Sequence, residues 1–305
     1  MDNQTKFIAE FTTNHMGNLN LLMKMTESAV AAGCDYIKMQ KKDVSKFYSK
    51  EKLGKLYKSP YGKTYKDYRE IFEFDNYSFD AFDEKCREMG VKWFATAQDL
   101  DSLYFLLNYN LDLYKVASVN ARNHEFLVEV SKNVPLDKSI VVSLAGATHE
   151  EVEKIVEIFS NHNILLNHCV AEYPCPEEKL RLENIAVLKE KFASDDRISI
   201  GYSGHELGFI PSLAAADLGA EFIERHFAMS RHSFVHHIEC SLEPQEFKEM
   251  VEIIRSGNDL KEIYGKHLDR ASFESFFGMS EIEKSFLIDQ TYGTKFVGKE
   301  SLWRD

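Results

Sequence analysis

The sequence predicts an α/β fold, a (β/α)8 TIM barrel with a short C-terminal extension. Eight short, mostly apolar segments alternate with amphipathic helical stretches, as expected for parallel strands covered by helices. An open, doubly wound sheet has the same alternation, but a dinucleotide-binding sheet of that kind needs a G-x-G-x-x-G turn after its first strand. Residues 10–17 contain one glycine, so we favour the barrel. The 305 residues suffice for one barrel, which takes about 250 residues.

The expected strands are near-continuous apolar runs, because both faces of a barrel strand are buried. They span residues 7–11, 36–40, 92–97, 114–118, 139–145, 164–170, 198–202 and 222–227. A period of 3.6 residues predicts helices between several of them. These helices span residues 20–32, 78–89, 149–160, 211–218 and 243–254. Glycine follows three of the helices, at positions 33, 90 and 219, and is a common helix stop.

We expect the barrel domain to span residues 1–256 and the extension residues 257–305. The extension is polar, with one helical pattern over residues 280–288 and no assignment for residues 294–305. Residues 41–76 are too many for a simple loop between strand and helix, and they include a basic, tyrosine-rich stretch. This segment is expected to fold over the top of the barrel as part of a substrate site. A surface insertion is the equally weighted alternative.

The composition argues against several partners and locations. It is ordinary for a globular protein, with 44% hydrophobic and 28% charged residues. The formal net charge of -12 argues against nucleic acid or an anionic membrane as partner. There is no apolar run of about 18 residues that could cross a membrane, and the N-terminal residues do not resemble a signal peptide. The five scattered cysteines contain no C-x-x-C pair, so we expect reduced thiols and a cytoplasmic protein.

Three expected strands have a histidine at or just after their carboxyl end, which is where an α/β barrel places its catalytic residues. The segments are EFTTNHMG at residues 10–17, GYSGH at 201–205 and ERHF at 224–227. Neutral imidazoles are good ligands for divalent metals such as Mn²⁺, Zn²⁺ or Fe²⁺. We therefore expect these distant segments to build a single metal or acid–base site, although a lone histidine is more often a hydrogen-bonded core residue. The run HSFVHH at 232–237 adds further candidate ligands or forms a solvated loop.

Two lysines interrupt apolar strands at Lys38 and Lys115. The outer face of a barrel strand is apolar, so both side chains are expected to point into the barrel. A buried ammonium group needs an anionic partner. That partner is either a bound dianion such as phosphate or a protein carboxylate, for which Glu10 is the obvious candidate. Hydroxyl groups at other strand ends are expected to complete an oxyanion cage, and they belong to Thr96, Ser118, Ser143 and Ser203.

Together these residues suggest a phosphate-bearing acid held by lysines and hydroxyls beside a divalent metal held by histidines. That combination suits metal-assisted addition to a carbonyl.

Seven ordered segments resemble the N-acetylneuraminate (sialic acid) synthase family. They are AEFTTNHMG (9–17), KMQ (38–40), KVAS (115–118), HCVAEYP (168–174), GYSGHELG (201–208), IERHF (223–227) and SLEP (241–244). Ordered agreement from about residue 7 to 256 is more specific than any single motif. The resemblance implies a transferase that condenses phosphoenolpyruvate with an N-acylated hexosamine. In the family mechanism a metal polarises the sugar aldehyde, the enolpyruvate C3 attacks it, water adds at C2 and phosphate leaves.

The resemblance also implies roles for single residues. His205 and His226 would bind the divalent metal, Mn²⁺ in the first place and Mg²⁺ or Co²⁺ as alternatives. Glu10, Gln40 and Tyr173 would serve catalysis and sugar binding. The remaining substrate-binding residues would be Lys38, Thr96, Lys115, Ser118, Ser143, Ser203, Asn14 and His237. Family members are typically dimers, so a homodimer is expected.

The chain departs from the family pattern mainly on the sugar side. Asn120 and Gly204 replace acidic residues, Ala171 replaces a small polar residue, and His237 replaces a sugar-binding carboxylate. The family's C-terminal antifreeze-like domain is expected to be missing. We therefore expect retained phosphoenolpyruvate chemistry on an unusual acceptor, with His237 as a candidate third metal ligand. The alternatives are condensation with a different aldose, giving another 2-keto-3-deoxy sugar acid, and a non-catalytic paralogue that binds a ligand or partner.

Overall fold

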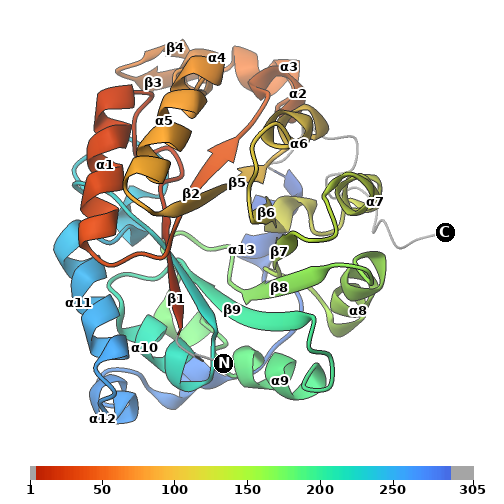
Figure 1. Cartoon of the computed structure of the whole chain (residues 1–305), viewed down its shortest axis with the longest axis vertical. Coiled ribbons are helices and arrows are strands. Elements are labelled where there is room, and N and C mark those ends of the chain that lie inside the picture. Colours follow the sequence, from red (N-terminus) through yellow and green to blue (C-terminus); the bar gives the residue numbers. More distant parts are fainter. Residues whose placement is uncertain (1–4, 290–305) are drawn as a thin grey trace.

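The predicted TIM barrel is confirmed by the computed structural model, which describes residues 5–289. Eight parallel strands close in the order β1-β10-β9-β8-β7-β6-β5-β2 (Figure 1). They are β1 (Lys6–Glu10), β2 (Tyr36–Lys41), β5 (Lys92–Ala97), β6 (Leu113–Val116), β7 (Ser139–Ser143), β8 (Asn163–His168), β9 (Ile198–Gly204) and β10 (Phe222–His226). All eight predicted strands exist. Strands β6, β7 and β8 end two residues earlier than predicted, and β9 continues two residues further.

Helices surround the strands in Figure 1. The helices of the eight strand–helix units are α1 (Leu19–Ala31), α5 (Asn76–Glu88), α6 (Leu100–Leu106), α7 (His124–Asn133), α8 (His149–Ile158), α9 (Glu183–Lys191), α10 (Ile210–Asp217) and α11 (Pro244–Arg255). The five predicted helices are confirmed, with ends within two residues. Helices α6, α7 and α9 were not predicted. They have seven to ten residues.

The barrel interior changes from apolar to polar along its strands. Near the amino ends, five side chains form a closed apolar cluster, contributed by Ile8, Phe94, Leu113, Val141 and Leu165. Side chains two positions apart on a strand point the same way. On the inward-facing side of β1, the apolar Ile8 is thus followed by the polar Glu10, and on β5 Phe94 is followed by Thr96. The barrel is plugged at its amino end and presents polar groups at its carboxyl end, which is where the functional residues lie.

The segment between β2 and α5 folds over the carboxyl ends of the strands. It contains α2 (Val44–Phe47), α3 (Lys50–Gly54), the hairpin of β3 (Leu56–Ser59) and β4 (Gly62–Thr64), and α4 (Tyr65–Glu70), at the top of Figure 1. The expectation that this segment folds over the top of the barrel is confirmed, and its side chains line the pocket described below. The segment packs closely on the loop after β1. A Cβ at Gly17 would lie 1.9 Å from the carbonyl oxygen of Ile71.

The C-terminal extension returns to the same end of the barrel. Helix α12 (Leu260–Tyr264) packs against α10, and α13 (Glu281–Lys284) continues into a π-helical turn over Ser285–Asp289. The helix predicted over residues 280–288 is thereby confirmed, whereas residues 294–305 lie outside the described residues. None of the helices formed by residues 5–289 is long and apolar enough to span a membrane.

Candidate active site

A pocket of about 1040 Å³ opens at the carboxyl ends of the strands. Every site residue predicted from the sequence except Asn14 lines it. They are Glu10, Lys38, Gln40, Thr96, Lys115, Ser118, Ser143, Tyr173, Ser203, His205, His226 and His237. These residues come from all parts of the barrel sequence. The fold therefore brings together a set that the motifs could only place at separate strand ends.

Asn14 and His15 lie outside the pocket lining. The side-chain amide of Asn14 donates to the carbonyl of Phe227 (2.8 Å) and the hydroxyl of Ser241 (3.1 Å), which ties the loops after β1 and β10 together. His15 is buried, and its ring centroid lies 4.5 Å from that of Phe74. The expectation that all three histidine-bearing segments meet in one site is thus wrong for His15, because the chain turns after β1 and directs this imidazole elsewhere.

A buried carboxylate network forms the pocket floor. Both predicted inward-pointing lysines have protein partners: Lys38 pairs with Glu10, and the Lys115 ammonium lies 3.0 Å from Glu224. Glu224 also accepts from the Ser203 hydroxyl (2.9 Å) and lies 3.5 Å from the Lys38 ammonium. Glu224 was not among the residues predicted from the sequence. Its position two residues before His226 on the same strand was the available signal, since it places both side chains inside the barrel.

The charged groups of this floor shift one another's pKa values. Burial alone would raise the pKa of Glu224, but the ammonium groups of Lys115 and Lys38 lower it to about 2. Burial lowers the pKa of Lys38 to about 8, although Glu224 opposes the shift. The Lys38 ammonium also donates to the Thr96 hydroxyl (3.1 Å). The floor thus holds two lysines and two carboxylates, and a bound anion would have to compete with the carboxylates for the ammonium groups.

His205 and His226 lie together, with ring centroids 5.4 Å apart. The His205 Nδ1 lies 2.7 Å from the Val170 carbonyl. Because a carbonyl can only accept, Nδ1 carries the proton and Nε2 keeps a free lone pair. Burial lowers the pKa of His205 to about 3 and that of His226 well below its usual value, so both rings are neutral near pH 7. Two neutral imidazoles of this kind fit a divalent metal.

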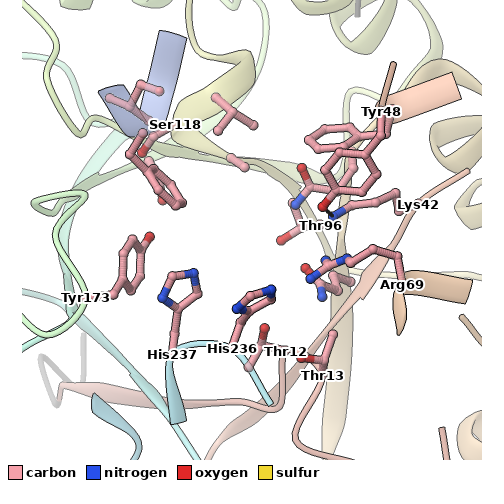
Figure 2. A pocket seen from close by; sticks show the side chains of 18 of the residues that line it. Thr12, Thr13, Lys42, Tyr48, Arg69, Thr96, Ser118, Tyr173, His236 and His237 are labelled. Atoms are coloured by element: carbon pink, nitrogen blue, oxygen red, sulfur yellow. Dashed lines mark hydrogen bonds between the residues drawn. The ribbon is translucent and has the colours of Figure 1, made fainter. Parts of the chain in front are cut away.

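The histidine pair would leave metal positions open. Within residues 5–289, no group of three or more histidine, cysteine, aspartate or glutamate side chains is placed to hold a metal ion. His237 therefore does not complete a three-residue ligand set in this arrangement. The ring centroid of His237 lies 4.1 Å from that of Tyr173, and the Tyr173 centroid lies 4.2 Å from that of His205. Tyr173 and His237 face the open centre of the pocket in Figure 2. Substrate or water oxygens would have to complete the coordination of a metal.

The four residues that depart from the family pattern differ in their surroundings. Asn120 is buried and donates to the Gln98 carbonyl (3.0 Å). The backbone N–H of Ala171 donates to the carboxylate of Glu283 in the C-terminal extension (3.2 Å). A Cβ at Gly204 would lie 2.6 and 2.7 Å from the two carboxylate oxygens of Glu206. Neither Asn120, Ala171 nor Gly204 lines the pocket. Of the four departures, only His237 faces the substrate space.

Comparison with known proteins identifies the family. Residues 25–266 match the NeuB family. The chain belongs to the NeuB family. This NeuB-family chain is 36% identical over 253 residues to the N-acetylneuraminate-9-phosphate synthase of Drosophila melanogaster. That match covers 81% of the chain and 66% of the fly protein, so the chain spans slightly less than two thirds of that relative.

Two further relatives of the NeuB-family chain support this assignment. Pseudaminic acid synthase of Campylobacter jejuni is 32% identical over 273 residues, covering 83% of the chain and 74% of the relative. The crystal structure of an N-acetylneuraminic acid synthetase from Leptospira borgpetersenii, in complex with citrate, superposes with a TM-score of 0.72 at 26% identity. It covers 93% of the chain and 90% of that structure. The resemblance stated from the motifs is confirmed.

Proposed function

We propose that this protein is a phosphoenolpyruvate-dependent condensing enzyme that makes a sialic-acid-like nonulosonic acid. One observation carries the proposal: Lys38, Lys115 and four hydroxyl side chains converge on the floor of one pocket, beside the paired His205 and His226. Lysines and hydroxyls suit a phosphate and a carboxylate, the two anionic groups of phosphoenolpyruvate. The names of the relatives point to the same class of product.

The proposed reaction joins phosphoenolpyruvate, an aldose and water. The enolpyruvate C3 forms a bond to the aldehyde carbon, whose oxygen takes up a proton to become a hydroxyl. Water adds at C2, and the phosphate leaves with the oxygen that linked it to C2. Lys38 and Lys115 would orient the enolpyruvate and screen its negative charge. Glu10 and Gln40 line the wall beside Lys38 and are our candidates for guiding protons and the sugar.

A divalent metal on His205 and His226, Mn²⁺ in our proposal, would polarise the aldehyde and stabilise negative charge on its oxygen. Tyr173 contacts the His205 ring and would exclude water from that side of the reacting carbon. The hydrogen bond from His205 Nδ1 to Val170 holds the ring orientation in the absence of ligand.

Family membership leaves the acceptor open, because one relative is named for a phosphorylated N-acetylneuraminate and another for pseudaminic acid. An N-acylated hexosamine is our first candidate. Condensation with a different aldose is the alternative within the same chemistry. We also infer a cytoplasmic location, since all five cysteines are free thiols. A homodimer stays a prediction, which sedimentation of the purified protein would test.

The proposal is tested by phosphate release from phosphoenolpyruvate with Mn²⁺, across N-acylated hexosamines and simple aldoses, with and without a chelator. Release that depends on one sugar and stops with chelator is the expected result. Absence of release with every sugar, from folded and metal-loaded protein that still binds phosphoenolpyruvate in calorimetry, would move the proposal to an untested acceptor. Absence of binding as well would favour a non-catalytic paralogue.

A further inference from the structure

Four lysine or arginine side chains line the outer part of the pocket, and one of them, Lys55, lies 3.8 Å from the carboxylate of Glu51, which also lines it. Lys42, Lys52 and Arg69 all belong to the segment between β2 and α5, above the strand ends that carry the floor residues. Lys42 is 5% exposed and Arg69 is 8% exposed. In Figure 2 both extend from the same wall into the open centre, across from Tyr173 and His237. Lysine and arginine are almost never this deeply buried unless an anion accompanies them.

The protein supplies Lys42 and Arg69 with aromatic partners. The Lys42 ammonium donates to the Tyr48 hydroxyl (3.1 Å) and lies 4.3 Å from the centroid of the Phe47 ring. The Arg69 guanidinium lies 5.5 Å from the Tyr48 ring and 5.9 Å from the Tyr68 ring. In the part of the chain that the structure describes, neither cation has a carboxylate within ion-pair distance. Lys38 and Lys115 on the floor each have one.

The nearby carboxylates have other partners. Glu73 accepts from the backbone N–H of Lys42 (3.1 Å) and lies 3.7 Å from the Lys41 ammonium. Asp99 accepts from the backbone N–H groups of Asp43 (2.7 Å) and Ser102 (2.8 Å). These bonds occupy oxygens of both carboxylates. The positive charge that Lys42 and Arg69 direct into the pocket is therefore only partly balanced.

The cations also act on one another. Burial lowers the pKa of Lys42 and the charge of Arg69 lowers it further, whereas the charges of Glu73 and Asp99 oppose part of the shift. Burial lowers the pKa of Lys52 to about 8, and Arg69 and Lys42 again add to the shift. A site that holds like charges together in a buried position is stabilised when an anion enters it. The arrangement is costly without a ligand and favourable with an anionic one.

We propose that Lys42 and Arg69, assisted by Lys52, bind a phosphate monoester that the acceptor sugar carries at the end remote from its aldehyde. This inference rests on the proposed function, which leaves the acceptor open. A phosphate monoester is a dianion near pH 7, and a planar guanidinium can donate two parallel hydrogen bonds to it. The pocket would then hold two anions, the enolpyruvate on the floor and the sugar phosphate at the mouth.

The spacing of the two cationic sites suits such a substrate. Lys42 follows Lys38 by four residues along β2 and its extension, a rise of roughly 13 Å for extended chain. The cavity volume of about 1040 Å³ exceeds what phosphoenolpyruvate alone would fill. A sugar chain lying between the two sites would place its aldehyde near the floor and its far end against Arg69.

The test compares N-acetylmannosamine with its 6-phosphate as acceptors in the phosphate-release assay. We expect the wild-type protein to favour the phosphorylated sugar in kcat/KM. Arg69→Gln and Lys42→Gln should each reduce that preference by about 10- to 100-fold, the range for losing a charge-assisted hydrogen bond. The loss should appear mainly as a higher KM for the phosphorylated sugar. The KM for phosphoenolpyruvate, which the floor residues bind, should not change.

Lys66→Gln is the matched control, because Lys66 is on the same helix as Arg69 but is exposed and outside the pocket lining. It should leave the preference unchanged. Thermal unfolding of each variant establishes that it is folded, and Arg69→Lys should recover part of the preference if Gln at this position unfolds the protein. An unchanged preference in folded Arg69→Gln and Lys42→Gln, or a wild-type protein that does not favour the phosphorylated sugar, overturns the inference.

A binding measurement separates this inference from the proposed function. Calorimetry with mannose 6-phosphate and with mannose, in the absence of phosphoenolpyruvate, needs no turnover. The site is supported if mannose 6-phosphate binds, mannose does not, and Arg69→Gln abolishes the binding. This result would support the site even if the protein releases no phosphate from phosphoenolpyruvate. Turnover of both acceptors without any difference between them supports the synthase and overturns the site.

Discussion

Lys115 shows how one side chain can serve both the fold and the proposed chemistry. Its ammonium is 3.0 Å from Glu224, and its side chain is 2% exposed. Removing the charge leaves Glu224 with Lys38 and Ser203 as partners. A lysine-to-methionine change keeps the length of the side chain but removes the group that would face the enolpyruvate phosphate.

We predict that Lys115→Met raises the KM for phosphoenolpyruvate by roughly 10- to 100-fold, because a charge-assisted hydrogen bond contributes about 1.5–3 kcal/mol. Steady-state kinetics with varied phosphoenolpyruvate would measure the change. Lys92→Met is the control. Lys92 is exposed at the amino end of β5, away from the pocket, and pairs there with Asp112. Equal effects of the two substitutions would contradict the assignment of Lys115 to the floor.

The pKa of Lys38 gives a pH dependence with a definite sign. Burial lowers this pKa to about 8, so the ammonium is present below that pH and is lost as the pH rises through it. We predict that the affinity for phosphoenolpyruvate is highest below pH 8 and falls above it, measured as kcat/KM or by calorimetry from pH 6 to 10. In Lys38→Arg the fall should disappear, because a guanidinium keeps its charge over this range. A fall that persists in Lys38→Arg belongs to another group.

The histidine pair predicts metal binding that can be measured without turnover. His226→Asn should lower the affinity for Mn²⁺ at least tenfold, because one of two protein ligands is removed. Equilibrium dialysis followed by metal analysis would determine this. His124→Asn, on the exposed surface of α7, is the control and should leave Mn²⁺ binding unchanged. Full Mn²⁺ binding by His226→Asn would remove the proposed metal site.

At the scale of an element, β9 illustrates why one departure from the family pattern is structural. Ser203 and His205 point into the pocket, so Gly204 between them faces outward. There the Glu206 carboxylate occupies the space, accepts from the Tyr202 hydroxyl (2.7 Å), and pairs with Arg225 (2.7 Å). A side chain at position 204 has no room, and the aspartate usual in the family would also meet a like charge.

We therefore predict that Gly204→Ala destabilises the protein by about 1–3 kcal/mol, the usual cost of overpacking a well-packed region. A lower midpoint in urea unfolding at unchanged slope would be the readout. Gly54→Ala is the matched control, because nothing lies within 4 Å of a Cβ built there. Comparable stability of the two variants would mean that Glu206 moves aside at little cost.

At the scale of the whole molecule, the C-terminal extension braces the loop that carries Tyr173. Glu283 is fully buried. It accepts from the backbone of Ala171 (3.2 Å) and pairs with Arg181 (3.1 Å). Three residues further on, the ring centroid of Phe286 lies 5.1 Å from that of Tyr173. Residues more than a hundred positions apart thus share one wall of the pocket, and the extension belongs to the site as well as to the fold.

Breaking this brace should affect stability and the acceptor side together. We predict that Glu283→Gln costs roughly 3–5 kcal/mol, as expected for removing one partner of a buried ion pair, and raises the KM for the sugar more than that for phosphoenolpyruvate. Glu281→Gln on the same helix is the control, because its pair with Lys284 is exposed and contributes little. Thermal unfolding and two-substrate kinetics give the two readouts. A loss of stability without any kinetic effect would limit the extension to a structural role.

The sequence by itself determined the barrel and most of its catalytic end. Continuous apolar runs, glycine stops and strand-end motifs suffice for this, because backbone alternation decides which side chains of a strand point inward. Lys38, Lys115, His205 and His226 were all found in this way. The position of residues 41–76 over the pocket was also predicted, because their number and their tyrosines distinguish them from an ordinary loop.

Only the tertiary structure decided which polar residues meet. The exclusion of Asn14 and His15 from the pocket lining and the role of Glu224 as a partner of both lysines depend on loop geometry and on neighbours distant in sequence. The burial of Lys42 and Arg69 among tyrosines likewise follows from how the segment between β2 and α5 folds back on itself. Local periodicity carries no information about such contacts, because burial and pairing are set by the whole chain.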